Sequence, residues 1–196
     1  MPVRRPDALD ALAADLANRS GVSFAVASTD ADRDHCFRLR RAAVTERGWA
    51  LESQDPERDS FDDRAVHVVG WRDGAAVCCG RLVFPPGPLP TEMVCGITIE
   101  PAGSVVDVGR MTVASSVRRS DRAMFLSLLA ALYLETRARG YTTGCGMMAP
   151  SVRSLLRYLG VSLDVLGPDR MFQGERRSPV RFDVAVHGDA ALARWR

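Results

Sequence analysis

The spacing of hydrophobic residues predicts two helices and a strand in the N-terminal quarter of the chain. Residues 7–19 place leucines and alanines at helical spacing, which predicts an amphipathic helix. The apolar run 22–28 predicts a strand. A second helix is expected over 29–47, with Thr29 or Asp30 as its cap and Gly48 as its stop.

The middle of the chain begins with a polar segment and continues with a hairpin. Residues 50–63 are acidic and predict a loop. The runs 64–71 and 75–84 are apolar and are joined by Asp73-Gly74, which is a strong hairpin signal. After the hairpin we predict a loop over 85–90, a weak strand over 93–99 and a strand over 104–113. A helix is predicted over 120–139, capped by Ser120 and ended by Gly140, and it is followed by a strand over 141–147. A short helix over 151–159, ended by Gly160, precedes strands and turns in the tail.

This order of elements predicts an α/β (α+β) fold with helices on the faces of a sheet. The length of 196 residues suits one domain over 1–196, and neither a repeat nor a linker divides it. Within it we expect an N-terminal helical cap region over 1–50 and a core of sheet and helices over 64–186.

The composition narrows the classes of function. Hydrophobic residues make up 46% of the chain and charged residues 26%, but the net charge is only +2, which does not favour a nucleic-acid partner. We find no run long enough for a membrane span and no signal peptide, so a cytoplasmic protein is expected. The five cysteines lack zinc-ligand spacing, so we expect reduced core thiols and no metal.

The first candidate for chemistry is the acidic segment ERDSFDD. Glu57, Asp59 and Asp62 could converge on an ammonium or sulfonium group, or hold a proton acceptor near an amine. The plain alternative is a solvated acidic loop, although Phe61 is expected to anchor the segment to the body.

The second candidate lies in strands. Asp107 and Arg110 interrupt an apolar run, and Arg81 lies in the middle of another, where it needs a carboxylate partner. Residues at i and i+3 on a plain strand face opposite ways, so Asp107 and Arg110 can share a site only if the strand carries a bulge. Gly109 is where such a bulge forms easily. An ion pair at a strand end is the alternative.

The third candidate is the basic stretch Arg118, Arg119 and Arg122. It lies at the start of the helix predicted over 120–139, where a phosphate or an acidic carrier protein could bind. A solvated helix start is the alternative, and no P-loop or G-x-G-x-x-G pattern is present.

Taken together, five segments resemble the autoinducer (acyl-homoserine lactone) synthases and the related N-acyl amino acid synthases. The segments are RAAVTERGW (41–49), ERDSFDD (57–63), GRLVFPPGPLP (80–90), VDVGRMTVASSVRR (106–119) and MMAPSVRSLLRYLGV (147–161). The resemblance covers roughly residues 35–182. It implies the acetyltransferase-like (GNAT) fold, a mixed central sheet splayed into a V that admits the acyl-pantetheine arm.

The resemblance also implies roles for individual residues. Glu57, Asp59 and Asp62 match the E-x-D-x-x-D carboxylates that position the acceptor amine, and Arg81 matches the arginine that pairs with them. Asp107 and Arg110 match the E-x-S-R element. The remaining matches are Trp49 over the acceptor, and Arg118, Arg119 and Arg122 beside the pantetheine and the carrier protein.

The sequence departs from the family pattern at three places. Asp107 replaces a glutamate and Gly109 replaces a serine, while Val44 and Thr45 stand where the N-terminal cap has an aromatic residue. These changes bear on the acceptor more than on the fold. The segment LGPDRMFQGERRSP is more similar to the N-acyl amino acid synthases.

The mechanism that follows is direct N-acyl transfer with no bound cofactor. The donor is an acyl thioester on acyl-carrier protein or coenzyme A, and the acceptor is an amino-acid-type amine, with S-adenosylmethionine as one candidate. Asp59, Asp107 and Glu57 are the expected catalytic carboxylates, with Asp59 or Asp107 as the base. Backbone amides near Met111, Thr112 and Val113 are expected to bind substrate and stabilise the oxyanion. No cysteine or serine is set up as a nucleophile.

Two other functions stay open at this stage. One is an acetyl-CoA-dependent N-acetyltransferase, although the stretch TVASSVRRSDR lacks that group's glycine-rich pyrophosphate loop. The other is a non-catalytic binding module that has kept the fold, which would release no thiol from any mixture of donor and acceptor.

Overall fold

The strands of the computed structural model join one mixed sheet. The structure describes residues 8–19, 21–49, 57–120 and 123–184. The strand order is β1-β2-β3-β4-β5-β8-β6, with β7 paired to β8, and β4 and β5 form a parallel pair among antiparallel neighbours. The strands are β1 (Ser23–Val26), β2 (Val66–Arg72), β3 (Ala75–Val83), β4 (Val105–Val113), β5 (Thr143–Met148), β6 (Leu163–Val165), β7 (Arg170–Phe172) and β8 (Glu175–Asp183).

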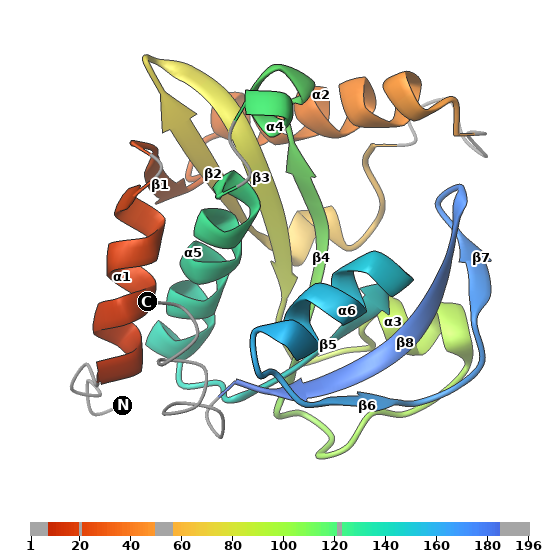
Figure 1. Cartoon of the computed structure of the whole chain (residues 1–196). Coiled ribbons are helices and arrows are strands. Elements are labelled where there is room, and N and C mark those ends of the chain that lie inside the picture. Colours follow the sequence, from red (N-terminus) through yellow and green to blue (C-terminus); the bar gives the residue numbers. More distant parts are fainter. Residues whose placement is uncertain (1–7, 20, 50–56, 121–122, 185–196) are drawn as a thin grey trace.

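The helices cover both faces of this sheet (Figure 1). They are α1 (Ala8–Arg19), α2 (Asp30–Arg47), α3 (Pro90–Cys95), α4 (Ser115–Ser120), α5 (Met124–Ala138) and α6 (Pro150–Tyr158), with a 3-10 turn at Asp62–Arg64. Helix α5 packs on the β2–β4 face that carries Cys78 and Leu82, and α1 packs against α5. Helix α2 packs on the opposite face, where Cys36 meets Val69 and Cys79.

Most of the elements predicted from the sequence are confirmed, and their ends have local causes. Thr29 caps α2, because its side chain accepts from the amide of Asp32 while the Asp32 carboxylate accepts from the amide of Thr29. Gly48 ends the same helix with a φ of 61°. The hairpin joins β2 and β3 through Asp73-Gly74 as expected.

Two predictions are wrong. Residues 93–99 do not form a strand, because Pro90 starts helix α3 and Glu92 accepts hydrogen bonds from the amides of Leu89 and Ile99. The long helix does not start at Ser120, which is the last residue of α4. Helix α5 begins at Met124. On this helix Met124, Leu128 and Leu132 are buried, and Phe125 and Leu129 are half-buried.

The central feature of the sheet is a fork between β4 and β5. The two strands pair only where Val105, Val106 and Asp107 lie opposite Thr143, Gly144 and Cys145. Beyond that point β4 runs on toward α4, while β5 follows β8, and the strands diverge (Figure 1). A Cβ on Gly146 would lie 2.6 Å from the carbonyl oxygen of Val108, so only glycine fits at the fork. The splayed sheet implied by the resemblance is confirmed.

Candidate active site

The acidic segment before β2 folds onto the sheet instead of lying in solvent. Glu57 is fully buried, and the side chain of Asp62 has no exposed area. Arg40 of α2 donates to Asp62 Oδ1 at 2.9 Å and to the Glu57 carbonyl at 3.2 Å, and Arg81 of β3 donates to the same Oδ1 at 2.9 Å. Asp63, by contrast, is exposed. The solvated-loop alternative therefore fails for Glu57 and Asp62.

Charge pairing overcomes the cost of burying Asp62. Burial alone would raise the pKa of this carboxyl, but the two guanidinium groups of Arg40 and Arg81 lower the pKa to about 2. His67 lies beside them, with Nδ1 3.0 Å from Arg40 Nη2. Burial and the Arg40 charge lower the pKa of His67 to about 4, so this ring is neutral near pH 7.

Asp59 joins the two arginines that the sequence singled out. Its Oδ1 accepts from Arg81 at 2.7 Å and its Oδ2 from Arg110 at 2.9 Å. Burial works to raise the pKa of Asp59, but the Arg81 and Arg110 contacts prevail and hold it below its usual value. The expected pairing of Arg81 with acidic residues is thus found at Asp59 and Asp62.

A bulge in β4 brings Arg110 to this face of the sheet. Cys79 lies opposite Thr112 and Arg81 lies opposite Gly109, so β4 has one residue more than β3 in this interval. The bulge was expected at Gly109, but the residue with left-handed backbone is Arg110, at a φ of 52°. A non-glycine residue in that region carries strain, and such strain clusters at functional sites.

Asp107 makes different contacts from the rest of the charged group. Its Oδ2 accepts from the amide of Thr91 at 2.8 Å, at the start of α3, and lies 3.7 Å from the Cys145 thiol. It is buried, and burial raises its pKa against the opposing hydrogen bond from Thr91. In the described part of the chain Asp107 and Arg110 form no ion pair, so that alternative is not found.

A small polar cavity lies beside this network. Its volume is about 60 Å³. Glu57 and the predicted substrate-binding residues Met111, Thr112 and Val113 line it, with Trp49 at the end of α2. The other lining side chains are mostly arginines: Arg40, Arg47, Arg110, Arg118 and Arg177. Of the predicted acceptor-side residues, Trp49, Glu57 and Arg110 line this hollow, whereas Asp59, Asp62, Arg81 and Asp107 do not.

The β7–β8 turn closes one side of the polar cavity, a role that no sequence pattern predicted. The Gln173 amide faces Arg110, and with its oxygen on that side it accepts from Nη1 at 2.9 Å and Nε at 3.0 Å. Gly174, with a φ of 72°, packs directly on Trp49. The Arg177 guanidinium lies 5.5 Å from the centre of the Trp49 ring. The Gln-Gly pair within MFQGERR is typical of a turn, but no local sequence pattern indicates that this turn contacts Trp49.

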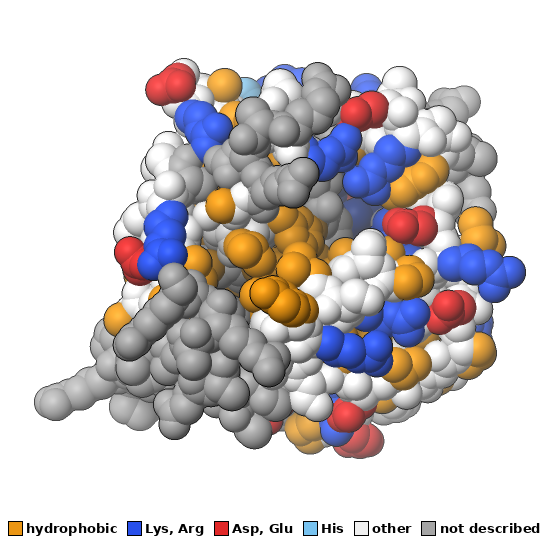
Figure 2. All heavy atoms as spheres, viewed as in Figure 1, with side chains coloured by type: hydrophobic (Ala, Val, Ile, Leu, Met, Phe, Trp, Pro, Cys, Tyr) orange, Lys and Arg blue, Asp and Glu red, His pale blue; other side chains and the backbone are white. Residues whose placement is uncertain are grey.

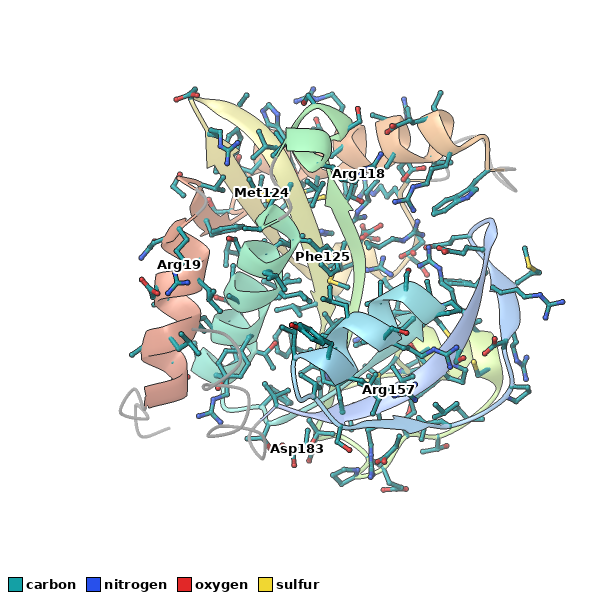
Figure 3. The ribbon with its side chains drawn as sticks, viewed as in Figure 1. Arg19, Arg118, Met124, Phe125, Arg157 and Asp183 are labelled. Atoms are coloured by element: carbon teal, nitrogen blue, oxygen red, sulfur yellow. The ribbon has the colours of Figure 1, made fainter. Side chains whose placement is uncertain are left out.

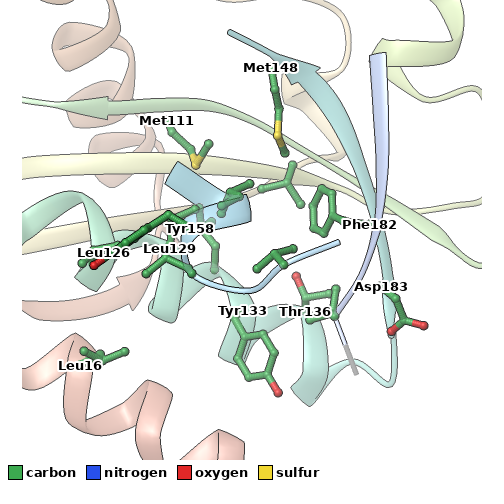
Figure 4. Close-up of a pocket in the computed structure, with 16 residues that line it drawn as sticks. Leu16, Met111, Leu126, Leu129, Tyr133, Thr136, Met148, Tyr158, Phe182 and Asp183 are labelled. Atoms are coloured by element: carbon green, nitrogen blue, oxygen red, sulfur yellow. The ribbon is translucent and has the colours of Figure 1, made fainter. Parts of the chain in front are cut away.

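A second cavity, apolar and about 260 Å³ in volume, opens at the fork on the α5 face (Figure 4). Met111 and Met148 point into it from the diverging strands, and Leu129 and Phe182 lie on its other sides. Figure 2 shows hydrophobic side chains gathered in a hollow on this face, with charged groups around them. Met111, next to the bulge of β4, lines both cavities.

The basic stretch after β4 is only partly described. Arg118 lies on α4, lines the polar cavity and pairs with Glu46 at 2.9 Å (Figure 3). The side chain of Arg119 and the whole of Arg122 lie outside the described residues. Arg118 lies on α4, and because α5 starts at Met124 it does not stand at the start of the long helix as the sequence suggested.

Other chemistries find little support in the described part of the chain. Its five cysteines are buried and unbridged, and burial raises the pKa of Cys78 to about 12. No group of acidic, histidine or cysteine side chains among the described residues could hold a metal ion. The described helices include none with the length and apolar character needed to cross a membrane.

Comparison with known proteins gives matches in structure alone. No family model matches the sequence, and no curated protein sequence matches it. The acyl-homoserine lactone synthase LasI superposes with a TM-score of 0.73 at 19% identity, over 87% of this chain and 94% of LasI. FeeM, an N-acyl amino acid synthase from uncultured soil microbes, gives 0.70 at 11% identity over 85% and 93%.

A further match is BjaI, a CoA-dependent acyl-homoserine lactone synthase solved with SAM and isopentyl-CoA. It gives a TM-score of 0.69 at 22% identity, over 89% of this chain and 88% of BjaI. The resemblance indicated by the sequence segments is thus confirmed as a structural likeness. The chain has the acetyltransferase-like α/β fold with a splayed sheet, and it shares its fold with acyl-homoserine lactone synthases and an N-acyl amino acid synthase.

Proposed function

We propose that the protein is an N-acyltransferase that moves an acyl chain from a thioester to the α-amine of an amino-acid-type acceptor. The observation that carries this proposal is that two unlike cavities share Met111 as a lining residue. The apolar one suits an acyl chain, and the polar one, with its carboxylate and guanidinium groups, suits an amino acid. The bulge between them is where the thioester carbonyl and the amine would meet.

The donor is acyl-carrier protein or acyl-CoA, and the reaction belongs in the cytoplasm, where both are made. Arg118, with Arg119 and Arg122, is proposed to contact the pantetheine phosphate or the acidic carrier protein. The fold's occurrence in the CoA-dependent synthase BjaI supports the CoA alternative, and SAM in that structure supports a SAM-like acceptor as one candidate.

Glu57 is the best placed of the three proposed catalytic carboxylates. It is the carboxylate that borders the polar cavity among the described residues, so it is within reach of an acceptor amine there. Asp59 is held by two arginines and its pKa is lowered, which suits positioning of Arg81 and Arg110 better than proton transfer. Asp107, with its raised pKa, lies at the fork and remains a second candidate base.

The proposed reaction is direct. The acceptor ammonium gives a proton to Glu57, and the amine nitrogen attacks the thioester carbonyl. A carbon–nitrogen bond forms and the carbon–sulfur bond breaks. The nitrogen then loses its second proton, and the leaving thiolate takes up a proton to become the thiol. Beyond Asp107 the β4 backbone has no β5 partner, so amides near Met111, Thr112 and Val113 are proposed to stabilise the oxyanion.

The test measures thiol release and N-acyl product together. Purified protein is incubated with acyl-carrier protein or acyl-CoA and a mixture of amino acids and SAM, and products are identified by mass spectrometry. We expect thiol release that depends on the acceptor. Failure to release thiol with any donor and acceptor would refute the proposal and favour a binding module.

Matched variants then separate the carboxylates. Glu57→Gln is expected to lower kcat by about 100-fold or more, as loss of a general base does. Asp63→Asn, in the same segment but exposed, is the control and should retain activity. Full kcat in Glu57→Gln with loss in Asp107→Asn would move the base to Asp107.

A further inference from the structure

The polar cavity carries an excess of positive charge. Among the described residues, five arginines and one acidic residue, Glu57, line it. Three of these arginines have carboxylate partners that are not lining residues: Arg40 pairs with Asp62, Arg110 with Asp59, and Arg118 with Glu46. For the other two, the described part of the chain shows no ion pair of Arg47 and only a long one of Arg177, with Glu175.

Arg47 and Arg177 are brought together by one aromatic ring. Their guanidinium carbons lie 4.6 Å and 5.5 Å from the centre of the Trp49 ring. Arg47 ends α2 and Arg177 lies on β8, so the pair joins two segments far apart in the sequence. The Arg177 side chain is only 17% exposed, and its ion pair with Glu175 is long, at 3.5 Å.

Gathering guanidinium groups around one hollow is costly without an anion. Burial, then the nearby Arg47 and Arg110 charges, lower the pKa of Arg177 against the opposing effect of Glu175. Burial and the Arg81 charge lower the pKa of Arg110 as well. A carboxylate in the cavity would remove this repulsion and take charge-assisted hydrogen bonds from arginine forks.

We propose that the acceptor is an acidic amino acid, with a second carboxylate besides its α-carboxylate. Its ammonium lies toward Glu57, and its two carboxylates match the guanidinium groups of Arg47 and Arg177. A neutral amino acid offers one carboxylate for two cations. The sulfonium of SAM adds a positive charge to a cavity that already has an excess.

The inference rests on the proposed function for its kinetic test, so a binding test accompanies it. L-glutamate is compared with its neutral isostere L-glutamine, and L-aspartate with L-asparagine, by calorimetric titration without donor and by kcat/KM with an acyl-CoA. We expect each acid to exceed its amide by about tenfold or more, because a charge-assisted pair is lost with the amide. Titration with SAM alone should give weaker binding than glutamate.

Variants then link the preference to the arginines. Arg177→Gln should bring the ratio of glutamate to glutamine down to about threefold or less, in titration as in turnover. Urea unfolding of the variant, with a midpoint close to that of the unaltered protein, excludes misfolding as the cause. Arg176→Gln is the matched control, since Arg176 is the neighbouring residue on β8 but is exposed.

Three outcomes would overturn the inference. Glutamine or SAM could equal or exceed glutamate in both binding and turnover. The ratio could stay unchanged in Arg177→Gln. Arg177→Gln could raise KM for the acyl-CoA and leave glutamate unaffected, in which case the arginines hold donor phosphates. If no acceptor supports thiol release, the proposed acyl transfer is refuted. The titrations without donor still show whether the cavity binds the acidic amino acids more tightly than their amides.

Discussion

Removal of the buried Asp62 charge should destabilise the protein strongly. Asp62→Asn keeps the shape of the side chain but leaves Arg40 and Arg81 buried on either side of a neutral amide. Lowering a carboxyl pKa from 3.8 to about 2 corresponds to about 2 kcal/mol at ~1.36 kcal/mol per pH unit. Breaking a buried pair by removing one partner costs about 3–5 kcal/mol. We therefore expect a loss of about 2–5 kcal/mol at pH 7.

The assay is urea unfolding followed by circular dichroism at pH 7, where the Asp62 contribution is fully present. A carboxyl with a lowered pKa stabilises the fold above its unfolded pKa, and the stabilisation is lost only as the pH falls from about 4 toward 2. Asp63→Asn is the control: its ion pair with Arg58 is more than half exposed, and it should change stability by less than about 0.5 kcal/mol. An Asp62→Asn variant within about 1 kcal/mol of the unaltered protein would refute the argument that paired burial dominates here.

Three further predictions concern the turn, the apolar cavity and pH. Gly174→Ala should lower the free energy of unfolding by more than about 1 kcal/mol, since its φ is 72° and its Cβ would lie 2.2 Å from Trp49 Cγ; unchanged urea unfolding would contradict this. Leu129→Trp should shift the preferred acyl chain of the products to shorter lengths, because it fills the apolar cavity, and an unchanged product profile would count against that cavity as the acyl site. His67, with its pKa lowered to about 4, binds a proton more weakly when folded, so stability should fall as the pH drops from about 6.5 to 4; His67→Gln should flatten that part of the urea-derived stability profile, and an equal slope would argue against a buried neutral ring.

Local signals account for most of the fold that could be predicted. Thr29 and Gly48 bound α2 through contacts within a few residues, and Asp73-Gly74 sets the first hairpin. The errors lie where local signals competed. The apolar residues after Pro90 suggested a strand. Helix α3 forms instead, because proline is favourable at the first helical position and Glu92 accepts the amide hydrogen bond of Leu89 at the start of the helix.

The sequence by itself determined which charged residues are unusual. Carboxylates after a helix stop and arginines inside apolar strands pointed to Asp59, Asp62, Arg81 and Arg110, because charges at such positions need partners. The sequence did not determine whether these groups contact one another. The structure shows that they do, because Asp59 forms ion pairs with both Arg81 and Arg110.

Only the tertiary structure decided the rest of the site. The β4 bulge turns Arg110 toward Asp59, the Gln173-Gly174 turn closes on Trp49, and Arg47 and Arg177 share one ring. Asp107, expected in the same group, instead meets the start of α3. These contacts join segments that are separated by tens of residues in the sequence. Burial and charge pairing between such segments depend on how the sheet splays, and no local sequence pattern predicts that splay.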